Sequence, residues 1–179
     1  MMKKYFIITT IIITTLFFSA RPIQAQVAPT IGVEPGNILP DITLNDLDGN
    51  PHKISELRGS IVLVDFWASW CRPCRRENPV LVKTYRDFKN KKFKDAVGFK
   101  IFSISFDKTR QDWSKAIETD GLFWDTHASD LQGWHSTAAI KYNVRAIPMN
   151  FLIDQKGVII AKNLRGDQLA EALQKLVKE

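Results

Sequence analysis

The chain has 179 residues, 45% of them hydrophobic and 25% charged, which is the ordinary composition of one globular domain with its own core. Its formal net charge is +6, but three of its 25 basic residues lie in the first 21 positions, which leaves +3 for the remainder. So small an excess is not typical of a nucleic-acid-binding protein, and we expect no nucleic-acid partner.

The N-terminal residues have the pattern of a secretory signal. Two lysines precede an uncharged apolar run over residues 5–20, and Ala25 offers a cleavage point. We expect a signal peptide over residues 1–25 and a linker over residues 26–35. An uncleaved anchor is the alternative. The length of the apolar run disfavours it, because a spanning helix needs roughly 20 residues. The prediction is an exported, periplasmic protein that contacts the membrane only if the leader is retained.

The first half of the remaining chain predicts a hairpin, a buried strand and a helix. Residues 39–54 indicate a β-hairpin, because Asp48-Gly49 supplies the positive dihedral angles of a tight turn. Residues 61–67 form a continuous apolar, β-branched run, which is typical of a central strand buried on both faces. An amphipathic pattern over residues 74–92 predicts the helix.

The second half predicts a further strand and helix, an irregular segment, a hairpin and a final helix. These fall at residues 97–106, 112–119, 120–136, 147–162 and, after the N-cap Asp167, up to 177. This order of elements is typical of an α/β domain in which helices cover a mixed sheet. The irregular segment contains Trp124, His127, Trp134 and His135. We expect packing and surface residues of an insertion there, with a partner-recognition surface as the alternative.

Both cysteines of the chain lie in one tetrapeptide, Cys71-Arg72-Pro73-Cys74, where the buried strand meets the helix. A structural bridge across so short a loop would contribute only about 2 kcal/mol. An exported domain held together by disulfides would instead have several dispersed cysteines. Two cysteines in the first turn of a helix suit a reversible disulfide. Cys71, at the positive helix end, is the predicted nucleophile, and Cys74 is the predicted resolving thiol.

A zinc site is the main alternative for a pair of cysteines with this spacing. It would need two further ligands, and the three histidines of the chain lack the paired spacing of such sites. We therefore expect neither a metal nor a cofactor.

The residues around the cysteines resemble a known family. The segment VLVDFWASWCRPC, from Val62 to Cys74, is similar to the active-site segment of the thioredoxin superfamily. The lead-in over 39–59, the Ala146-Ile147-Pro148 segment and the hairpin over 151–161 resemble one branch, the exported TlpA/ResA-like disulfide reductases.

This resemblance covers nearly all of the chain after the leader. It implies a thioredoxin-like fold over residues 33–179, with a central mixed β-sheet flanked by helices. It also implies an N-terminal β-hairpin extension and an insertion around residues 107–140.

The resemblance also assigns roles near the cysteines. Pro148 would be a cis-proline beside the disulfide, and Ile147 would offer its backbone groups to a substrate chain. Asp65 would be the buried acid that accepts the proton of Cys74, and a carboxylate in an apolar strand should have a raised pKa. Glu77 matches an active-site glutamate of the ResA-like branch, and an ordinary surface acid is the alternative.

Trp70, Arg72 and Pro73 complete the predicted substrate-binding surface. Trp70 would shield the sulfur of Cys71. Arg72 departs from the family pattern, because thioredoxins have glycine there and ResA-like proteins often have an acid. A cation beside Cys71 should favour its thiolate and make the couple more oxidising.

The implied function is thiol–disulfide exchange between the Cys71–Cys74 pair and exported proteins. We expect a reductase more than an oxidase, with cytochrome c apoproteins as the substrate class that the family suggests and an upstream membrane electron donor. One alternative is a thiol peroxidase of the peroxiredoxin type, which Ala68 disfavours because those enzymes have a hydroxyl residue at that position. The other is a non-catalytic polypeptide-binding module, which the intact cysteine pair disfavours.

Overall fold

The computed structural model describes residues 29–178. The expected leader over residues 1–25 therefore lies outside the described residues. Five strands form a mixed sheet in the order β5-β4-β3-β6-β7, and β1 and β2 form a separate antiparallel hairpin. The strands are β1 Thr43–Asn45, β2 Pro51–Lys53, β3 Ile61–Trp67, β4 Phe99–Ser105, β5 Thr126–Ala128, β6 Met149–Ile153 and β7 Ile159–Lys162.

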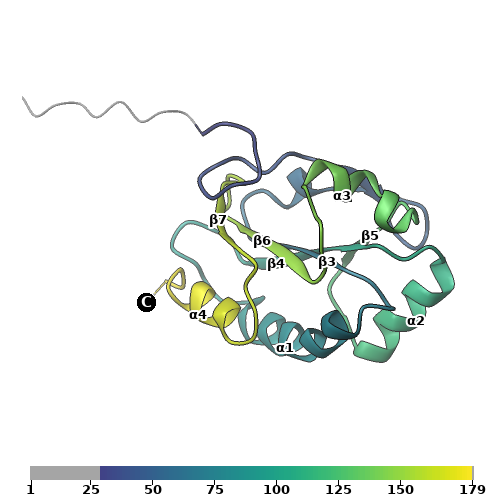
Figure 1. Cartoon of the computed structure of the whole chain (residues 1–179). Coiled ribbons are helices and arrows are strands. Elements are labelled where there is room, and N and C mark those ends of the chain that lie inside the picture. Colours follow the sequence, from purple (N-terminus) through teal and green to yellow (C-terminus); the bar gives the residue numbers. More distant parts are fainter. Residues whose placement is uncertain (1–28, 179) are drawn as a thin grey trace, which may run out of the picture.

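The helices cover both faces of the sheet. They are α1 Arg72–Phe88, α2 Arg110–Asp120, α3 Thr137–Lys141 and α4 Gln168–Gln174, with short 3-10 turns η1 Ile54–Leu57 and η2 Gly133–His135. Figure 1 shows α1, α2 and α4 on one side of the sheet and α3 on the other. This architecture confirms the predicted thioredoxin-like α/β fold with an N-terminal hairpin.

Strand β3 is the centre of the sheet. It pairs in parallel with β4 and antiparallel with β6, and all seven of its residues are buried. Its Phe66 ring packs against Tyr142 and Phe151, and burial of each such ring contributes roughly 1.5–3 kcal/mol. The strand ends four residues before Cys71, so the most buried element of the fold positions the cysteine pair.

The predicted hairpin forms over a shorter span than its pattern indicates. Thr43 pairs with Lys53 and Asn45 with Pro51. Gly49 has a φ of 90°, which favours glycine and explains the turn. The Asp46 carboxylate accepts hydrogen bonds from the backbone N–H groups of Asp48 and Asn50, so it stabilises the same turn.

The expectation that residues 120–136 are only loop or irregular helix was wrong at residues 126–128. They form β5, which extends the sheet through parallel pairing of Thr126 with Phe102 and Ala128 with Ile104. Three residues with no apolar alternation give no local strand signal, and pairing with β4 makes the strand. The crossover from β4 to β6 therefore contains α2, β5, η2 and α3.

Within residues 29–178, no helix is both long and apolar enough to cross a bilayer.

Candidate active site

Cys71 and Cys74 form a disulfide at the start of α1, with 5.2 Å between their Cα atoms. Cys71 occupies the N-cap position, and its Sγ accepts a hydrogen bond from the backbone N–H of Cys74 at 3.2 Å. Pro73 fits in the first turn because the N–H that proline lacks has no partner within the helix there. Cys71 is 4% exposed and Cys74 is 1% exposed, so Cys74 is the more deeply buried of the two cysteines.

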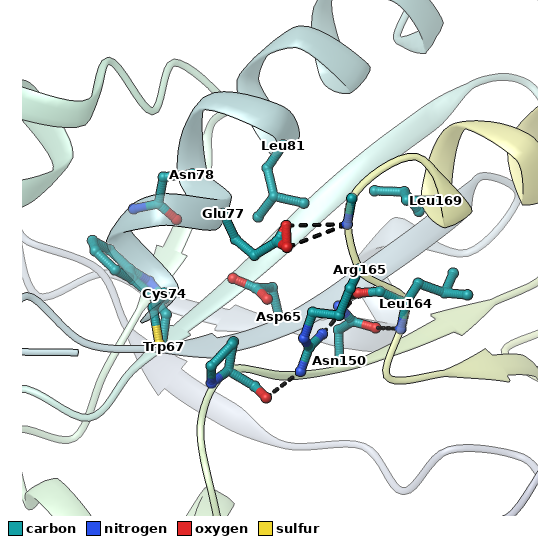
Figure 2. A pocket seen from close by; sticks show the side chains of 12 residues that line it. Asp65, Trp67, Cys74, Glu77, Asn78, Leu81, Asn150, Leu164, Arg165 and Leu169 are labelled. Atoms are coloured by element: carbon teal, nitrogen blue, oxygen red, sulfur yellow. Dashed lines mark hydrogen bonds between the residues drawn. The ribbon is translucent and has the colours of Figure 1, made fainter. Parts of the chain in front are cut away.

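Asp65 lies in β3 and is 4% exposed. It lines a small cavity of about 10 Å³ together with Cys74, Glu77 and Arg165 (Figure 2). That volume is close to the smallest that holds one water molecule. Burial raises the pKa of Asp65 to about 7, the charge of Arg165 opposes this effect, and the charge of Glu77 adds to it. A carboxyl group with such a pKa can take up and release a proton near neutral pH.

Glu77 lies one turn after Cys74 on α1 and is half-buried at the same cavity. Both of its carboxylate oxygens lie 3.2 Å from the backbone nitrogen of Gly166, which donates to them (Figure 2). Gly166 has a φ of 53°, a conformation that favours glycine, and it lies in the loop before α4. The loop therefore holds the Glu77 carboxylate beside Asp65.

The Ile147–Pro148 peptide bond is cis, as the resemblance implies. The carbonyl oxygen of Pro148 accepts a hydrogen bond from the Arg165 guanidinium, which also donates to the carbonyl of Leu164 at 2.7 Å. Asn150, two residues after Pro148, exchanges two hydrogen bonds with the backbone of Leu164, at 2.9 and 3.0 Å. The proline turn and the loop before α4 are thereby joined on one side of the disulfide.

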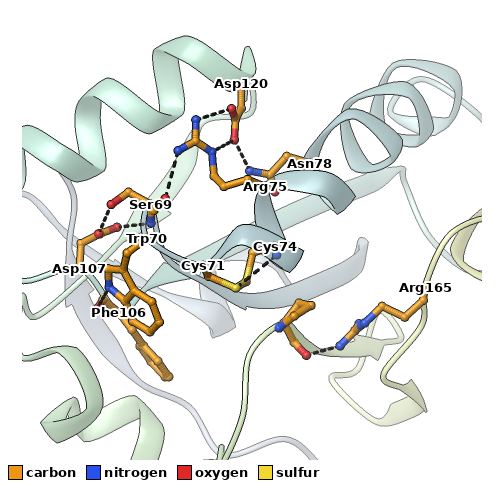
Figure 3. Close-up of a disulfide and its surroundings, with 11 residues drawn as sticks. Ser69, Trp70, Cys71, Cys74, Arg75, Asn78, Phe106, Asp107, Asp120 and Arg165 are labelled. Atoms are coloured by element: carbon orange, nitrogen blue, oxygen red, sulfur yellow. Dashed lines mark hydrogen bonds and ion pairs between the residues drawn. A yellow bond between two sulfur atoms is a disulfide. The ribbon is translucent and has the colours of Figure 1, made fainter.

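The other side of the disulfide is held by Asp107, two residues after the end of β4 (Figure 3). Its carboxylate accepts hydrogen bonds from the backbone N–H and the hydroxyl of Ser69, at 3.0 and 2.5 Å, and from the hydroxyl of Ser105 at 2.7 Å. The indole N–H of Trp70 donates to the carbonyl of Phe106 at 3.2 Å. These bonds fix the two residues that precede Cys71.

An ion pair joins α1 to the end of α2. The guanidinium of Arg75 makes two bonds to the carboxylate of Asp120 and donates to the carbonyl of Ser69 at 3.1 Å (Figure 3). Asn78 donates to the same Asp120 carboxylate at 2.6 Å. The pKa of Arg75 is raised mainly by its hydrogen bond to Asp120. The start of α1 is thus connected to the loop that carries Trp70.

Comparisons with known proteins agree with this geometry. Residues 35–162 match a family model described as the AhpC/TSA family. The chain belongs to the AhpC/TSA family. One relative is the thiol-disulfide oxidoreductase ResA of Geobacillus kaustophilus (strain HTA426), 33% identical over 124 residues that cover 69% of this chain and 66% of the relative. Another is the thioredoxin-like protein YneN of Bacillus subtilis (strain 168), 28% identical over 159 residues, with 89% and 88% covered.

A solved structure is also similar. It is the thioredoxin domain of a thiol-disulfide oxidoreductase from Bacteroides vulgatus, with a TM-score of 0.73 and 37% sequence identity. The similarity covers 82% of this chain and all of that domain. With the Cys71–Cys74 pair, these similarities show that this AhpC/TSA family member is a thiol-disulfide oxidoreductase.

The predicted substrate-binding residues surround the disulfide. Trp70, Arg72 and Pro73 are exposed, whereas Ile147 and Pro148 are partly buried. Trp67, expected in the core, is buried there. The antiparallel pairing of Phe66 with Met149 places the Ile147–Pro148 segment at the same end of the sheet as the cysteine pair.

The histidines lie in three separate places. His52 is 3.0 Å from Asp46 in the hairpin, His135 is exposed, and His127 is buried and stacked on Trp124 with 5.3 Å between ring centroids. Burial lowers the pKa of His127 to about 4, so it is neutral near pH 7. Within the part of the chain that the structure describes, no three potential ligand side chains gather in a way that could hold a metal ion.

Sequence reasoning missed four polar residues of this site: Asp107, Asp120, Arg75 and Arg165. Asp107 had a usable signal, because the carboxyl ends of the neighbouring parallel strands β3 and β4 lie at the same edge of the sheet. Arg165 had none, since it reaches Pro148 from a loop 17 residues further along the chain.

Proposed function

We propose that this oxidoreductase is exported and reduces disulfides in other exported proteins. The observation that carries the proposal is the position of Asp65, whose pKa is about 7, in one small cavity with Cys74. A resolving thiol needs a proton acceptor before it can attack, and this carboxyl group provides one at neutral pH.

In the first step, the thiolate of reduced Cys71 attacks one sulfur of a substrate disulfide. A bond forms between Cys71 and that sulfur, and the other substrate sulfur leaves as a thiolate. The N-terminus of α1 favours the Cys71 thiolate through its partial positive charge and its free N–H groups. The backbone groups of Ile147 would pair with the extended substrate segment, in a groove shaped by cis-Pro148.

In the second step, Cys74 gives its proton to Asp65 and attacks the sulfur of Cys71. The Cys71–Cys74 bond forms, the bond to the substrate breaks, and the second substrate thiolate is released. Two electrons have moved from the protein to the substrate, which leaves with two thiols. A membrane electron donor would restore the dithiol.

The family resemblance suggests cytochrome c apoproteins as substrates. Their haem-attachment motif carries two cysteines separated by two residues, so it can form a disulfide of this kind. A peptide with that motif in its oxidised form is therefore the preferred first substrate.

A reduction assay with three proteins tests the proposal. The reduced wild type should convert the oxidised peptide to its dithiol, and Cys71→Ser should be inactive. Cys74→Ser should accumulate a covalent complex with the peptide, visible by mass spectrometry, because nothing resolves the mixed disulfide. If the wild type and Cys71→Ser acted equally on the peptide, a binding module would be favoured. If hydrogen peroxide oxidised the reduced protein faster than the peptide does, a thiol peroxidase would be favoured.

Export has its own test. Intact-mass analysis of the protein from the extracytoplasmic fraction should give a chain that begins at Gln26, because the cleavage point follows Ala25. A chain that retains residues 5–20 and stays in the membrane fraction would instead indicate the anchored form.

A further inference from the structure

Two tryptophans are exposed next to the reactive disulfide. Trp70, adjacent to Cys71, is 51% exposed, and Trp134, from η2, is 44% exposed. Their ring centroids are 6.1 Å apart, and Trp134 also packs edge-on against Phe106 at 5.4 Å. Exposed tryptophans are uncommon on a surface with no binding role, because each leaves a large apolar area in water.

These rings line a pocket of about 400 Å³, here called the tryptophan pocket. Its lining side chains are Trp70, Phe106, Asp107, Lys108, Asp112 and Trp134. The pocket therefore extends from the active-site loop to the crossover between β4 and β6, and it lies on the Asp107 side of the disulfide. It is separate from the small cavity that contains Asp65.

Acidic groups outnumber basic groups in the tryptophan pocket. Asp112 is exposed, and Asp107 is 1% exposed with three hydrogen bonds that orient its carboxylate. Lys108 is the one cation among the lining residues. Its side chain lies over Gly133, where an added Cβ would be 3.0 Å from its Cε, and this packing restricts where its ammonium can lie. Arg72 does not line the pocket.

We infer that the tryptophan pocket binds a lysine or arginine side chain of the substrate, located within a few residues of the substrate cysteine that Cys71 attacks. The alkyl stem and cationic head of such a side chain pack on indole faces, and the head is attracted to the two carboxylates. In an extended segment each residue advances about 3.3 Å, so a position two or three residues from the cysteine lies about 7–10 Å from it. This inference rests on the proposed reduction of protein disulfides and adds the substrate's preferred charge.

Peptides with one cysteine, capped as a mixed disulfide with 5-thio-2-nitrobenzoate, test the inference. Attack by Cys71 of the reduced protein on the peptide sulfur releases the thionitrobenzoate anion, the better leaving group, and its absorbance gives the second-order rate constant of this single turnover. Arginine, leucine, glutamate or alanine is placed in turn two and three residues before and after the cysteine. We expect the arginine peptide to exceed the glutamate and leucine peptides at one position by about fivefold, and by less as salt is added.

Variants identify the pocket as the source of this preference. Trp134→Ala and Asp112→Asn should each reduce the ratio of arginine to glutamate rates, and Lys108→Gln should increase it. Phe123→Ala is the matched control, because Phe123 is an exposed aromatic residue that packs against Tyr85, away from the disulfide. Its ratio should equal that of the wild type.

The outcomes separate the two claims. Reaction of all peptides at equal rates, a preference for leucine, or a ratio unchanged by Trp134→Ala would overturn the inference and leave the proposed function intact. Failure of every peptide, including the alanine reference, to react with the wild type would overturn the proposed function and this inference with it.

Discussion

Two buried carboxyl groups lie on opposite sides of the disulfide, and they differ in their surroundings. Asp107 accepts three hydrogen bonds from Ser69 and Ser105 and holds the loop before Cys71. Asp65 is almost as buried, but its pKa is set by burial and by the charges of Arg165 and Glu77. The first arrangement holds a carboxyl group in place through hydrogen bonds, whereas the second leaves a carboxyl group that changes its protonation near pH 7.

The comparison shows that burial alone does not decide what an acidic side chain does. Three donors replace the water that Asp107 lost on folding, so this residue can act as a rigid structural link. Few donors reach Asp65 in its small cavity, so the proton is retained until the pH approaches neutrality. The loop beside the nucleophile is fixed, and the group beside the resolving thiol can exchange a proton.

Replacement of Asp65 by asparagine gives the largest expected effect. The pKa of Asp65 is higher in the folded chain, about 7, than the ordinary value of 3.8, so the folded state binds more protons and its stability falls as pH rises from about 4 to 7. The difference corresponds to roughly 4 kcal/mol. At pH 8, Asp65→Asn should therefore raise the free energy of unfolding of the oxidised protein by up to that amount, and at pH 4 by little.

Urea denaturation at several pH values measures this gain. Asp48→Asn is the control, because Asp48 is an exposed carboxylate of the hairpin turn, and this variant should show no pH-dependent gain. An Asp65→Asn protein whose stability follows the same pH dependence as the wild type would refute the assignment of a raised pKa.

Substitution of Asp107 should lower the free energy of unfolding, whereas substitution of Asp65 raises it. Asp107→Ala leaves the Ser69 N–H and the hydroxyls of Ser69 and Ser105 without their acceptor, at a cost of about 3 kcal/mol. Asp107→Asn retains one carbonyl oxygen as an acceptor, so its free energy of unfolding should fall by less. Urea denaturation at pH 8 gives both values. If Asp107→Asn stabilised the protein as Asp65→Asn does, the contrast between the two carboxyl groups would be lost.

Arg72 gives the smallest expected effect, because it is exposed and its charge is screened by solvent. Arg72→Glu should weaken the preference of Cys71 for the thiolate and make the potential of the couple more negative, by at most about 30 mV. Equilibration with glutathione measures the potential. Arg76→Glu, an exposed change of the same charge on α1, is the control and should shift it less. A potential for Arg72→Glu that is no more negative than the parent's would contradict this role.

The parts of the site that sequence could predict are those held by local geometry or carried by a recognisable segment. Cys71 and Cys74 lie at a visible junction of strand and helix, and Asp65 belongs to the same segment. Asp107 and Arg165 come together with this segment only when the sheet closes. Ser69 is 38 residues from Asp107 in the chain, and Glu77 is 89 residues from Gly166.

The same reason explains the fold elements that were missed. Strand β5 exists through its pairing with β4, and its three residues have no pattern of their own. Trp124 and His127 could not be distinguished from Trp134 by composition. The structure buries His127 within the new strand and Trp124 just before it, and it exposes Trp134 next to Trp70.

The central claim is that reduced Cys71 is an activated nucleophile, and its alkylation rate tests this most directly. In reduced Cys74→Ser, Cys71 is the only thiol of the chain. Its rate of reaction with iodoacetamide should follow a titration whose midpoint lies well below the ordinary cysteine pKa of about 8.5, so that the thiol remains reactive at mildly acidic pH. A midpoint at or above that value would contradict the account.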